Sequence, residues 1–438
     1  MFYRLRIAFV LFAVSVLLAG IMILPLSGCS REEQKSRGPA EAGETVIEVW
    51  CHQGRESENE AMRAMVAAFN EAHAGEGVRV EIEFFPDAED TNKIYTAAAA
   101  GTMPDVFDLD GPLLASFVDS GLLQPLDQWV DAGMREDFIP TILEQGTVND
   151  KLYALGAFDS ALVLYYDKEM LDRAGVTPPP ELEAWTWDGF LSACEKLKQA
   201  GMDPVALHMD DKADEWYTYA FSPVVWSNGG RLISEDGATV EGVLDARENV
   251  EALTRWKQIF DRDYAARAPV DPDPFGAGKT AMDWTGHWMA PSHIENKGEA
   301  LGAMPLPKAG PGKVAPSGSW CWGISSETAD PESAAMWLKW VVHPEHGVEP
   351  MVRANGAVPA RKSAFAAFPE YEEMPYKLFR AQLEGWARSR PKTPQYATVT
   401  QHFAAAVRDI AQGDDPQSRL QDAATRIQRV LDRQKEDR

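Results

Sequence analysis

Alternating strand and helix patterns over residues 46–109 constrain the fold of this chain most strongly. A β-rich run at 46–50 precedes a capping-box pattern at 57–60, and apolar residues then recur at helical spacing at Met62, Met65 and Phe69. Apolar and polar residues alternate over 78–84, an Ala-rich stretch ends at Gly101, and 104–109 is again apolar. This β-α-β-α-β order predicts an open parallel sheet. Ligands of such sheets bind outside the carboxyl ends of the strands, which here means the loops Cys51–Ser57 and Asp110–Leu113.

A second block of similar pattern follows Gly146. Apolar strands are expected over 153–166, and helices over 167–174 and 187–200, the second of them starting after Thr186. The C-terminal third is helical in pattern, with helices expected at 331–342, 401–410 and 419–431. Two α/β lobes in one chain fit this order better than a barrel.

The charge balance excludes one class of partner. With 42 basic and 67 acidic residues the formal net charge is −25, so the chain repels phosphate backbones, and we expect no nucleic acid partner.

The N-terminus has the layout of an export signal. Arg4 and Arg6 precede an apolar run from Ile7 to Leu26, and Leu26-Ser-Gly-Cys29 resembles the bacterial lipobox. We therefore expect a signal peptide at 1–28, lipid acyl chains such as palmitate on Cys29, and a flexible tether at 29–45 without core-forming residues. The protein would be exported and anchored to a bacterial membrane, in the periplasm or on the outer cell surface.

Three cysteines remain after Cys29, and no motif indicates a cofactor. Small buried hydrophobic residues are the favoured interpretation of Cys51, Cys194 and Cys321; one disulfide plus one free thiol is the alternative. The segment 276–280 suggests a phosphate loop, but Asp273 stands where such a loop needs glycine. Neither HExxH nor CxxC occurs. We expect no cofactor and no bound metal.

Aromatic content is the unusual feature of the composition. All 14 tryptophans follow residue 49, and several stand in turn-like contexts, namely Trp226, Trp284, Trp288, Trp320 and Trp322. Sugars present flat C–H faces and a rim of hydroxyls, so their sites combine aromatic rings with carboxylates, amides and arginine. Core packing remains at least as good an interpretation for each single tryptophan. We assign Trp256, Trp337 and Trp340 to the core, because they lie on amphipathic helical patterns.

Four segments in order resemble one known family, the extracellular solute-binding lipoproteins of bacterial ABC importers, of the sugar-binding kind that includes maltodextrin-binding proteins. The segments are Pro104–Phe107 with Gly121–Asp127, Ala161–Leu171 with Thr186–Phe190, Phe275–Met282 with Gly286–Trp288, and Asn355–Arg361. The resemblance covers nearly all of the body after the expected tether.

The resemblance implies a two-lobed periplasmic-binding-protein fold, similar to type II, with an interlobe ligand cleft that closes by hinge motion. The implied crossings lie near Gly156, near Ser317–Gly323 and around Phe365. One lobe would contain 46–156 and 323–366, and the other 157–322 and 367–438.

The resemblance also implies a set of ligand-binding residues. Trp288 matches the aromatic residue of the family's G-x-W segment, Trp284 is a possible second stacking surface, and Glu215, Trp216 and Tyr217 match an acidic-aromatic run. The others are placed by their positions at strand ends or crossings: His52, Asp110, Asp159, Ser160, Trp320 and Trp322.

The implied function is capture of a sugar or oligosaccharide and its delivery to the permease subunits of an ABC transporter, by a monomer that makes and breaks no bond. Two alternatives stay open: a receptor of the same class for a non-sugar solute such as a polyamine or glycerol phosphate, and an anchored glycoside hydrolase.

Overall fold

The computed structural model describes residues 44–209, 213–268 and 271–436. The expected signal peptide, the lipidation site Cys29 and all but the last residues of the expected tether lie outside these ranges. None of the helices within the ranges combines the length and the apolar character that a membrane crossing needs.

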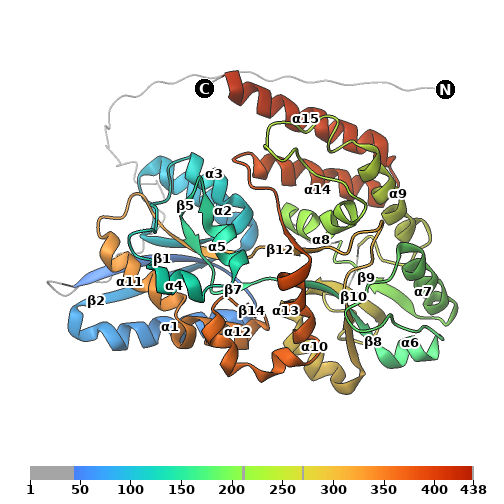
Figure 1. The fold of residues 1–438 in the computed structure, drawn as a ribbon, viewed down its shortest axis with the longest axis horizontal. Helices are drawn as coiled ribbons and strands as arrows, with labels where there is room; N and C mark the ends of the chain where they lie inside the picture. The colour runs from blue at the N-terminus through green and yellow to red at the C-terminus, as the bar shows by residue number, and fades with distance from the viewer. Residues whose placement is uncertain (1–43, 210–212, 269–270, 437–438) are drawn as a thin grey trace, which may run out of the picture. The chain divides into compact units, whose positions relative to one another are not determined.

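The first sheet contains the predicted β-α-β-α-β unit and lies on the left of Figure 1. Its strand order is β2-β1-β3-β13-β6. Strand β1 pairs in parallel with β2 and β3, which confirms the parallel start of the sheet, and β13 runs antiparallel to β3 and β6. The strands are β1 (Thr45–His52), β2 (Val78–Phe85), β3 (Val106–Asp110), β6 (Ala154–Leu155) and β13 (Trp320–Ile324).

The second sheet lies on the right of Figure 1 and has the order β11-β8-β10-β9. Strand β8 is antiparallel to β10 and β11, and β9 is parallel to β10. Its strands are β8 (Leu162–Asp167), β9 (Asp203–Ala206), β10 (Thr280–Gly286) and β11 (Leu301–Met304). Three short pairs complete the strands: β4 (Thr147–Val148) with β5 (Lys151–Leu152), β7 (Phe158–Asp159) with β14 (Val358–Pro359), and β12 (Ala315–Ser317) with β15 (Ala387–Ser389).

Helices surround both sheets. They are α1 (Glu56–His73), α2 (Asp87–Ala100), α3 (Leu114–Asp119), α4 (Ala132–Asp137), α5 (Pro140–Gly146), α6 (Lys168–Arg173), α7 (Trp187–Gln199), α8 (Asp214–Ser227), α9 (Arg247–Asp261), α10 (Ala290–Lys297), α11 (Pro331–Val341), α12 (Glu349–Asn355), α13 (Tyr376–Gly385), α14 (Tyr396–Gln412) and α15 (Pro416–Glu436). Short helical turns lie at η1 (Ala74–Glu76), η2 (Gly111–Leu113), η3 (His287–Met289), η4 (Gly298–Ala300), η5 (Pro344–Val348), η6 (Lys362–Ala367) and η7 (Pro369–Glu372).

The start of α1 differs from the sequence prediction by two residues. The helix begins at Glu56 after the N-cap residue Arg55, and the Glu58 carboxylate accepts from the backbone N–H of Arg55 at 2.8 Å. Ser57 lies inside the helix, and its hydroxyl donates to the carbonyl of Ala354. Glu58 thus accepts the hydrogen bond that the predicted capping box assigned to Glu60, and no serine caps this helix.

The chain passes between the sheets three times. The first passage leaves β6 at Leu155 and enters β8 at Leu162, and the second runs from β11 through β12 to β13, both as expected. The third is expected around Phe365, which packs on Tyr371 and Arg380. Helix α13, which follows, contacts the second sheet, because Gln382 donates to the carbonyl of Leu162 and the Phe379 ring meets that of Tyr165. Strand β15 (Ala387–Ser389) then pairs in parallel with β12 before the chain enters α14.

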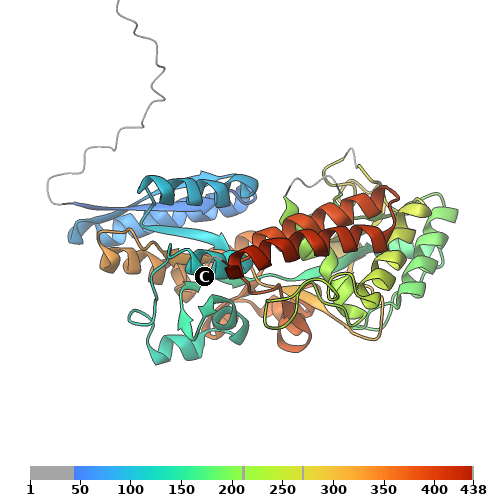
Figure 2. The same cartoon turned by 90° about the horizontal axis from the view of Figure 1, so that it is seen from above.

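Helices α14 and α15 run side by side in Figures 1 and 2. Helix α14 contacts α8 and α9, which cover the second sheet, and it also contacts α3 of the first. The C-terminal helices therefore pack mainly with the second sheet but also touch the first.

Two of the three tryptophans assigned to the core are completely buried. Trp256 and Trp337 are 0% exposed, whereas Trp340 is half-buried. Cys51, Cys194 and Cys321 are all buried, as the favoured interpretation of the cysteines expects.

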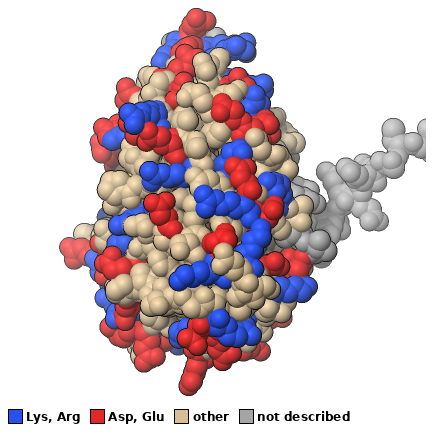
Figure 3. All heavy atoms as spheres, turned by 90° about the vertical axis from the view of Figure 1, so that its right-hand side faces the viewer, with Lys and Arg blue, Asp and Glu red and all other residues tan. Residues whose placement is uncertain are grey.

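Charges of both signs are interspersed over the face drawn in Figure 3. The negative net charge of the chain therefore does not form a single-sign surface on this face, which presents no continuous basic surface for a phosphate backbone.

We predict that Trp337→Ala lowers the free energy of unfolding by about 3–5 kcal/mol, because it opens a cavity in a packed core. Trp337 meets the ring of Phe69 edge-on at 5.5 Å and that of Trp322 at 6.3 Å. Urea unfolding measures the change, and Lys339→Ala on the same helix is the control, expected within about 0.5 kcal/mol of the parent. A loss below about 1 kcal/mol for Trp337→Ala would contradict this packing.

Candidate ligand-binding site between the two sheets

An ion cluster around Arg390 joins segments from both sheets. The guanidinium donates from Nη1 and Nη2 to the two carboxylate oxygens of Asp110, both at 2.8 Å, and Asp110 ends strand β3 of the first sheet. It also donates to Glu215 in the first turn of α8, and to the carbonyl of Gly318 at 3.1 Å. The side chain of Arg390 is only 4% exposed. One cation thus connects the end of β3, the start of α8 and the turn between β12 and β13.

The environment of Glu215 in this cluster shifts its titration. Its carboxylate accepts from the hydroxyl of Tyr396 at 2.5 Å in addition to Arg390. Burial raises the pKa of Glu215 to about 7; Arg390 opposes the rise and the charge of Asp110 adds to it. The ion pair with Arg390 is therefore fully formed only above neutral pH.

Asp159 and Ser160 lie on the first passage between the sheets. Asp159 is 0% exposed, and its Oδ1 accepts from the backbone N–H of Ser160 at 2.8 Å and of Gly318 at 3.1 Å. Burial raises the pKa of Asp159, although these hydrogen bonds oppose the rise. The hydroxyl of Ser160 lies 3.1 Å from the hydroxyl of Ser319. Asp159 therefore fixes the first two passages to each other.

His287 completes this polar group from the second sheet. Its Nδ1 lies 3.0 Å from the carbonyl of Asn355 and its Nε2 lies 3.1 Å from the Ser160 hydroxyl. Burial lowers the pKa of His287 to about 4, so the ring is neutral at physiological pH. Nδ1 then donates to the carbonyl of Asn355.

Three aromatic rings lie next to the polar groups. Trp288, in η3, meets Trp216 edge-on at 6.2 Å and Tyr219 at 6.3 Å. Tyr219 in turn lies beneath the guanidinium of Arg390, at 4.8 Å from its ring centroid. Trp288 is half-buried, whereas Trp216 and Tyr219 are 8% and 6% exposed. The G-x-W spacing has a steric reason, because a Cβ at Gly286 would approach the Trp288 ring to 2.1 Å.

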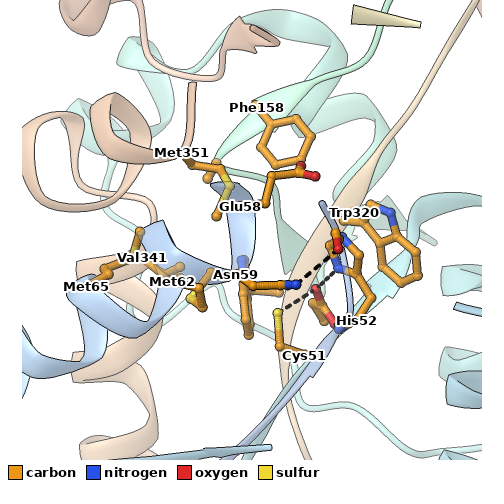
Figure 4. Close-up of a pocket in the computed structure, with 14 residues that line it drawn as sticks. Cys51, His52, Glu58, Asn59, Met62, Met65, Phe158, Trp320, Val341 and Met351 are labelled. Carbon is orange, nitrogen blue, oxygen red and sulfur yellow. Dashed lines mark hydrogen bonds and ion pairs between the residues drawn. The ribbon is translucent and has the colours of Figure 1, made fainter. Parts of the chain in front are cut away.

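His52 and Trp320 form a stacked pair beside the carboxyl end of β3. His52 is the last residue of β1, and Trp320 is the first residue of β13. Their ring centroids are 3.8 Å apart with an interplanar angle of 7°, and Trp320 pairs with Asp110 in the strand register. The Nδ1 of His52 lies 2.5 Å from Asp108 Oδ2. Behind the pair is a small pocket, partly open to solvent, which Figure 4 shows.

Two groups of side chains among the described residues could hold a metal ion: Cys51, His52 and Asp108, and Asp273, Asp283 and His293. In the second group Asp283 is 0% exposed and accepts from Nε2 of His208 at 2.7 Å and of His293 at 3.0 Å. Burial raises the pKa of Asp283, but the two histidines outweigh it and the pKa lies below its ordinary value. The His208 ring meets the Trp216 ring edge-on at 5.8 Å. His208 therefore connects Asp283 to the aromatic rings of the site.

The structure brings most of the predicted site residues together. Six of them line the junction of the sheets, namely Asp110, Asp159, Ser160, Glu215, Trp216 and Trp288, and His52 and Trp320 lie beside Asp110. Two lie in the core instead: Trp284 at 0% exposure donates its indole N–H to the carbonyl of Ala220, and Tyr217 at 1% donates its hydroxyl to the carbonyl of Met209. Trp322 is 4% exposed and lines the pocket behind His52 and Trp320.

Arg390, Tyr219 and Tyr396 are missing from the sequence prediction. Arg390 stands among Arg388 and Lys392 in a stretch without a motif, so no pattern distinguishes it from its neighbours. Tyr219 could have been found, since it follows Trp216 by one helical turn and so shares its face of α8.

We predict that the titration of Glu215 makes the folded protein less stable as the pH rises towards 7. The pKa of Glu215 is raised to about 7 in the folded state, whereas an unfolded glutamate titrates near about 4.3. Its stabilising contribution is therefore complete below pH ~4.3 and is lost, by about 1–3 kcal/mol, as the pH rises from there to about 7. Urea unfolding at pH values near 5 and 7.5 measures this change, and Glu215→Gln should remove it. An unaltered pH dependence in that variant would contradict the assignment.

Comparisons with known proteins agree with this architecture. A family model described as "Bacterial extracellular solute-binding protein" matches residues 55–347. The maltodextrin-binding protein MdxE of Bacillus subtilis is 26% identical over 409 residues, covering 91% of this chain and 92% of that protein. The galactooligosaccharide-binding protein of the same species is 23% identical over 423 residues, covering 93% and 94%.

Solved structures show the fold. The GacH receptor of Streptomyces glaucescens, solved unliganded and with acarbose, superposes with a TM-score of 0.76 at 22% identity and covers 89% of this chain and 98% of its own. The substrate-binding protein Lmo0181 of Listeria monocytogenes, in complex with cycloalternan, gives a TM-score of 0.77 at 19% identity, covering 89% and 99%. The two sheets are thus the two α/β lobes of a periplasmic-binding-protein fold, and the chain belongs to the family of bacterial extracellular solute-binding proteins.

Proposed function

We propose that this chain is the substrate-binding subunit of an ABC importer, and that it captures a sugar or oligosaccharide between its lobes. The observation that carries the proposal is the contact of an aromatic group, Trp288, Trp216 and Tyr219, with the ion cluster around Arg390. The relatives that bind maltodextrin and galactooligosaccharide support the choice of ligand class.

The chemistry of the site suits a polyhydroxylated ligand. Aromatic faces take the C–H faces of a sugar ring, and carboxylate and guanidinium groups accept from and donate to its hydroxyls. Asp110 comes from the first sheet, whereas Glu215 and the aromatic rings come from elements of the second. A ligand that contacts both sets favours the closed arrangement of the lobes by its differential affinity for that arrangement.

The family consists of binding proteins, and we infer that this chain likewise releases its ligand unchanged, to the permease subunits of its transporter. We further propose that it acts as a monomer, exported and anchored through lipid on Cys29. The lobe boundaries stay as proposed from the sequence, with 46–156 and 323–366 in one lobe and 157–322 and 367–438 in the other.

Replacing Trp288 by alanine should weaken sugar binding by about 1–3 kcal/mol, because the variant loses a stacking face while the surrounding fold stays intact. Isothermal titration calorimetry measures the dissociation constant. Trp185→Ala is the matched control, since Trp185 is another half-buried tryptophan, placed just before α7. An unchanged constant for a folded Trp288→Ala protein would remove this ring from the site.

A thermal-shift panel tests the ligand class. It contains mono- and oligosaccharides, with polyamines and glycerol phosphates as comparison solutes. A ligand at 100 times its dissociation constant stabilises by about 2.7 kcal/mol, so we expect the melting temperature to rise with one sugar series and the sugar to be recovered unchanged. A rise with a comparison solute alone would contradict the ligand class, and hydrolysis of the sugar would indicate the glycoside hydrolase instead.

A further inference from the structure

Two donors from neighbouring residues of β1 converge on one carboxylate oxygen of β3. The Sγ of Cys51 donates to Asp108 Oδ2 at 3.4 Å, and the Nδ1 of His52 lies 2.5 Å from the same oxygen. The other oxygen, Oδ1, accepts from the backbone N–H of His52 at 2.8 Å. Ligand atoms of the three residues lie within 4.8 Å of one another. A thiol, an imidazole and a carboxylate therefore meet at one point.

The charge of this group is not balanced by a permanent cation. Asp108 is 3% exposed, and no lysine or arginine in the described part of the chain forms an ion pair with it. Burying a carboxylate is costly unless it is paired or coordinates a metal. Here the pairing groups are a thiol and a histidine, which are themselves metal ligands.

The group opens into a pocket. Figure 4 shows Cys51 and His52 on one side of it and the side chains of Met62, Met65 and Met351 on the other. The pocket is partly open to solvent and its cavity of about 20 Å³ has room for a water molecule. It offers an entry path and room for a further ligand beside the three side chains, both of which a metal site requires.

We propose that Cys51, His52 and Asp108 form a Zn²⁺ site at the floor of this pocket, a function beyond ligand transport. Thiolate, imidazole and carboxylate together are zinc ligands, whereas Ca²⁺ and Mg²⁺ select oxygen ligands alone. Zn²⁺ takes the place of the thiol proton, which leaves to solvent, and His52 binds through Nδ1 with its proton on Nε2. Water from the pocket occupies the fourth position.

The distances from Asp108 to Cys51 and to His52 need only a small change to match those between ligands of tetrahedral Zn²⁺. Tetrahedral Zn²⁺ places a thiolate sulfur and a carboxylate oxygen about 3.6 Å apart, close to the 3.4 Å between Cys51 and Asp108. An imidazole nitrogen and a carboxylate oxygen would lie about 3.4 Å apart, so His52 moves about 0.9 Å away from Asp108. Because His52 stacks on Trp320 at 3.8 Å, this movement alters the surroundings of the indole ring.

Cobalt substitution tests the site directly. Co²⁺ added to the purified, reduced protein without sugar should give visible d–d bands and a near-ultraviolet thiolate-to-cobalt band, and Zn²⁺ should abolish both. Cys51→Ser should remove the thiolate band and weaken Zn²⁺ binding at least about tenfold. Cys194→Ser is the matched control, because Cys194 is an equally buried free thiol on α7, and it should keep the band.

A second variant keeps the test decisive if Cys51→Ser does not fold by circular dichroism. Asp108→Asn should keep the thiolate but weaken Zn²⁺ binding at least about tenfold in calorimetry. Absence of a thiolate band in the parent protein, or its persistence in folded Cys51→Ser, would overturn the proposal. So would equal Zn²⁺ affinity of the parent and folded Asp108→Asn. The sugar panel is measured without metal, so failure of the zinc site and failure of sugar binding are told apart.

Discussion

The guanidinium of Arg390 is the one positive charge on which the junction of the lobes depends. It holds both oxygens of Asp110 at 2.8 Å and also pairs with Glu215. Removing one partner of a buried ion pair costs about 3–5 kcal/mol, because the remaining charge stays in a poorly solvated place. Without Arg390, two carboxylates would face each other with no cation between them. The end of β3, the start of α8 and the segment after β15 keep their relative positions through this contact.

The same arrangement explains how one site can serve both capture and release. Its polar groups are held by each other in the absence of ligand, and Arg390 lies over the ring of Tyr219 at 4.8 Å. Sugar hydroxyls can replace part of these hydrogen bonds without leaving a charge unpaired, so exchange between ligand and protein contacts costs little. Stacking of the sugar on the aromatic rings then contributes the favourable free energy that makes the bound state more stable. Asp159 ties the first two passages together at the point where the lobes would hinge.

Local patterns in the sequence predicted local structure well. The β-α-β-α-β order follows from periodicity. Trp288 was found through the resemblance of Gly286–Trp288 to the family's G-x-W segment, and the structure shows that Gly286 leaves room for its ring. Side-chain depth was not predictable from such patterns. Trp320 and Trp322 share one face of β13, yet only Trp320 reaches the end of β3, where it pairs with Asp110, whereas Trp322 pairs with Asp108 further inside. Arg390 was missed because its partner Asp110 is 280 residues away, and no spacing rule relates residues so distant.

The central claim is that a sugar binds where Trp288 meets the Arg390 cluster, and a crystal structure of the protein with its best oligosaccharide tests it most directly. The account predicts a sugar ring packed against Trp288, with hydroxyls hydrogen-bonded to Asp110, Glu215 or Arg390. A sugar bound elsewhere, with the contacts between Arg390 and the two carboxylates unchanged and Trp288 untouched, would contradict it.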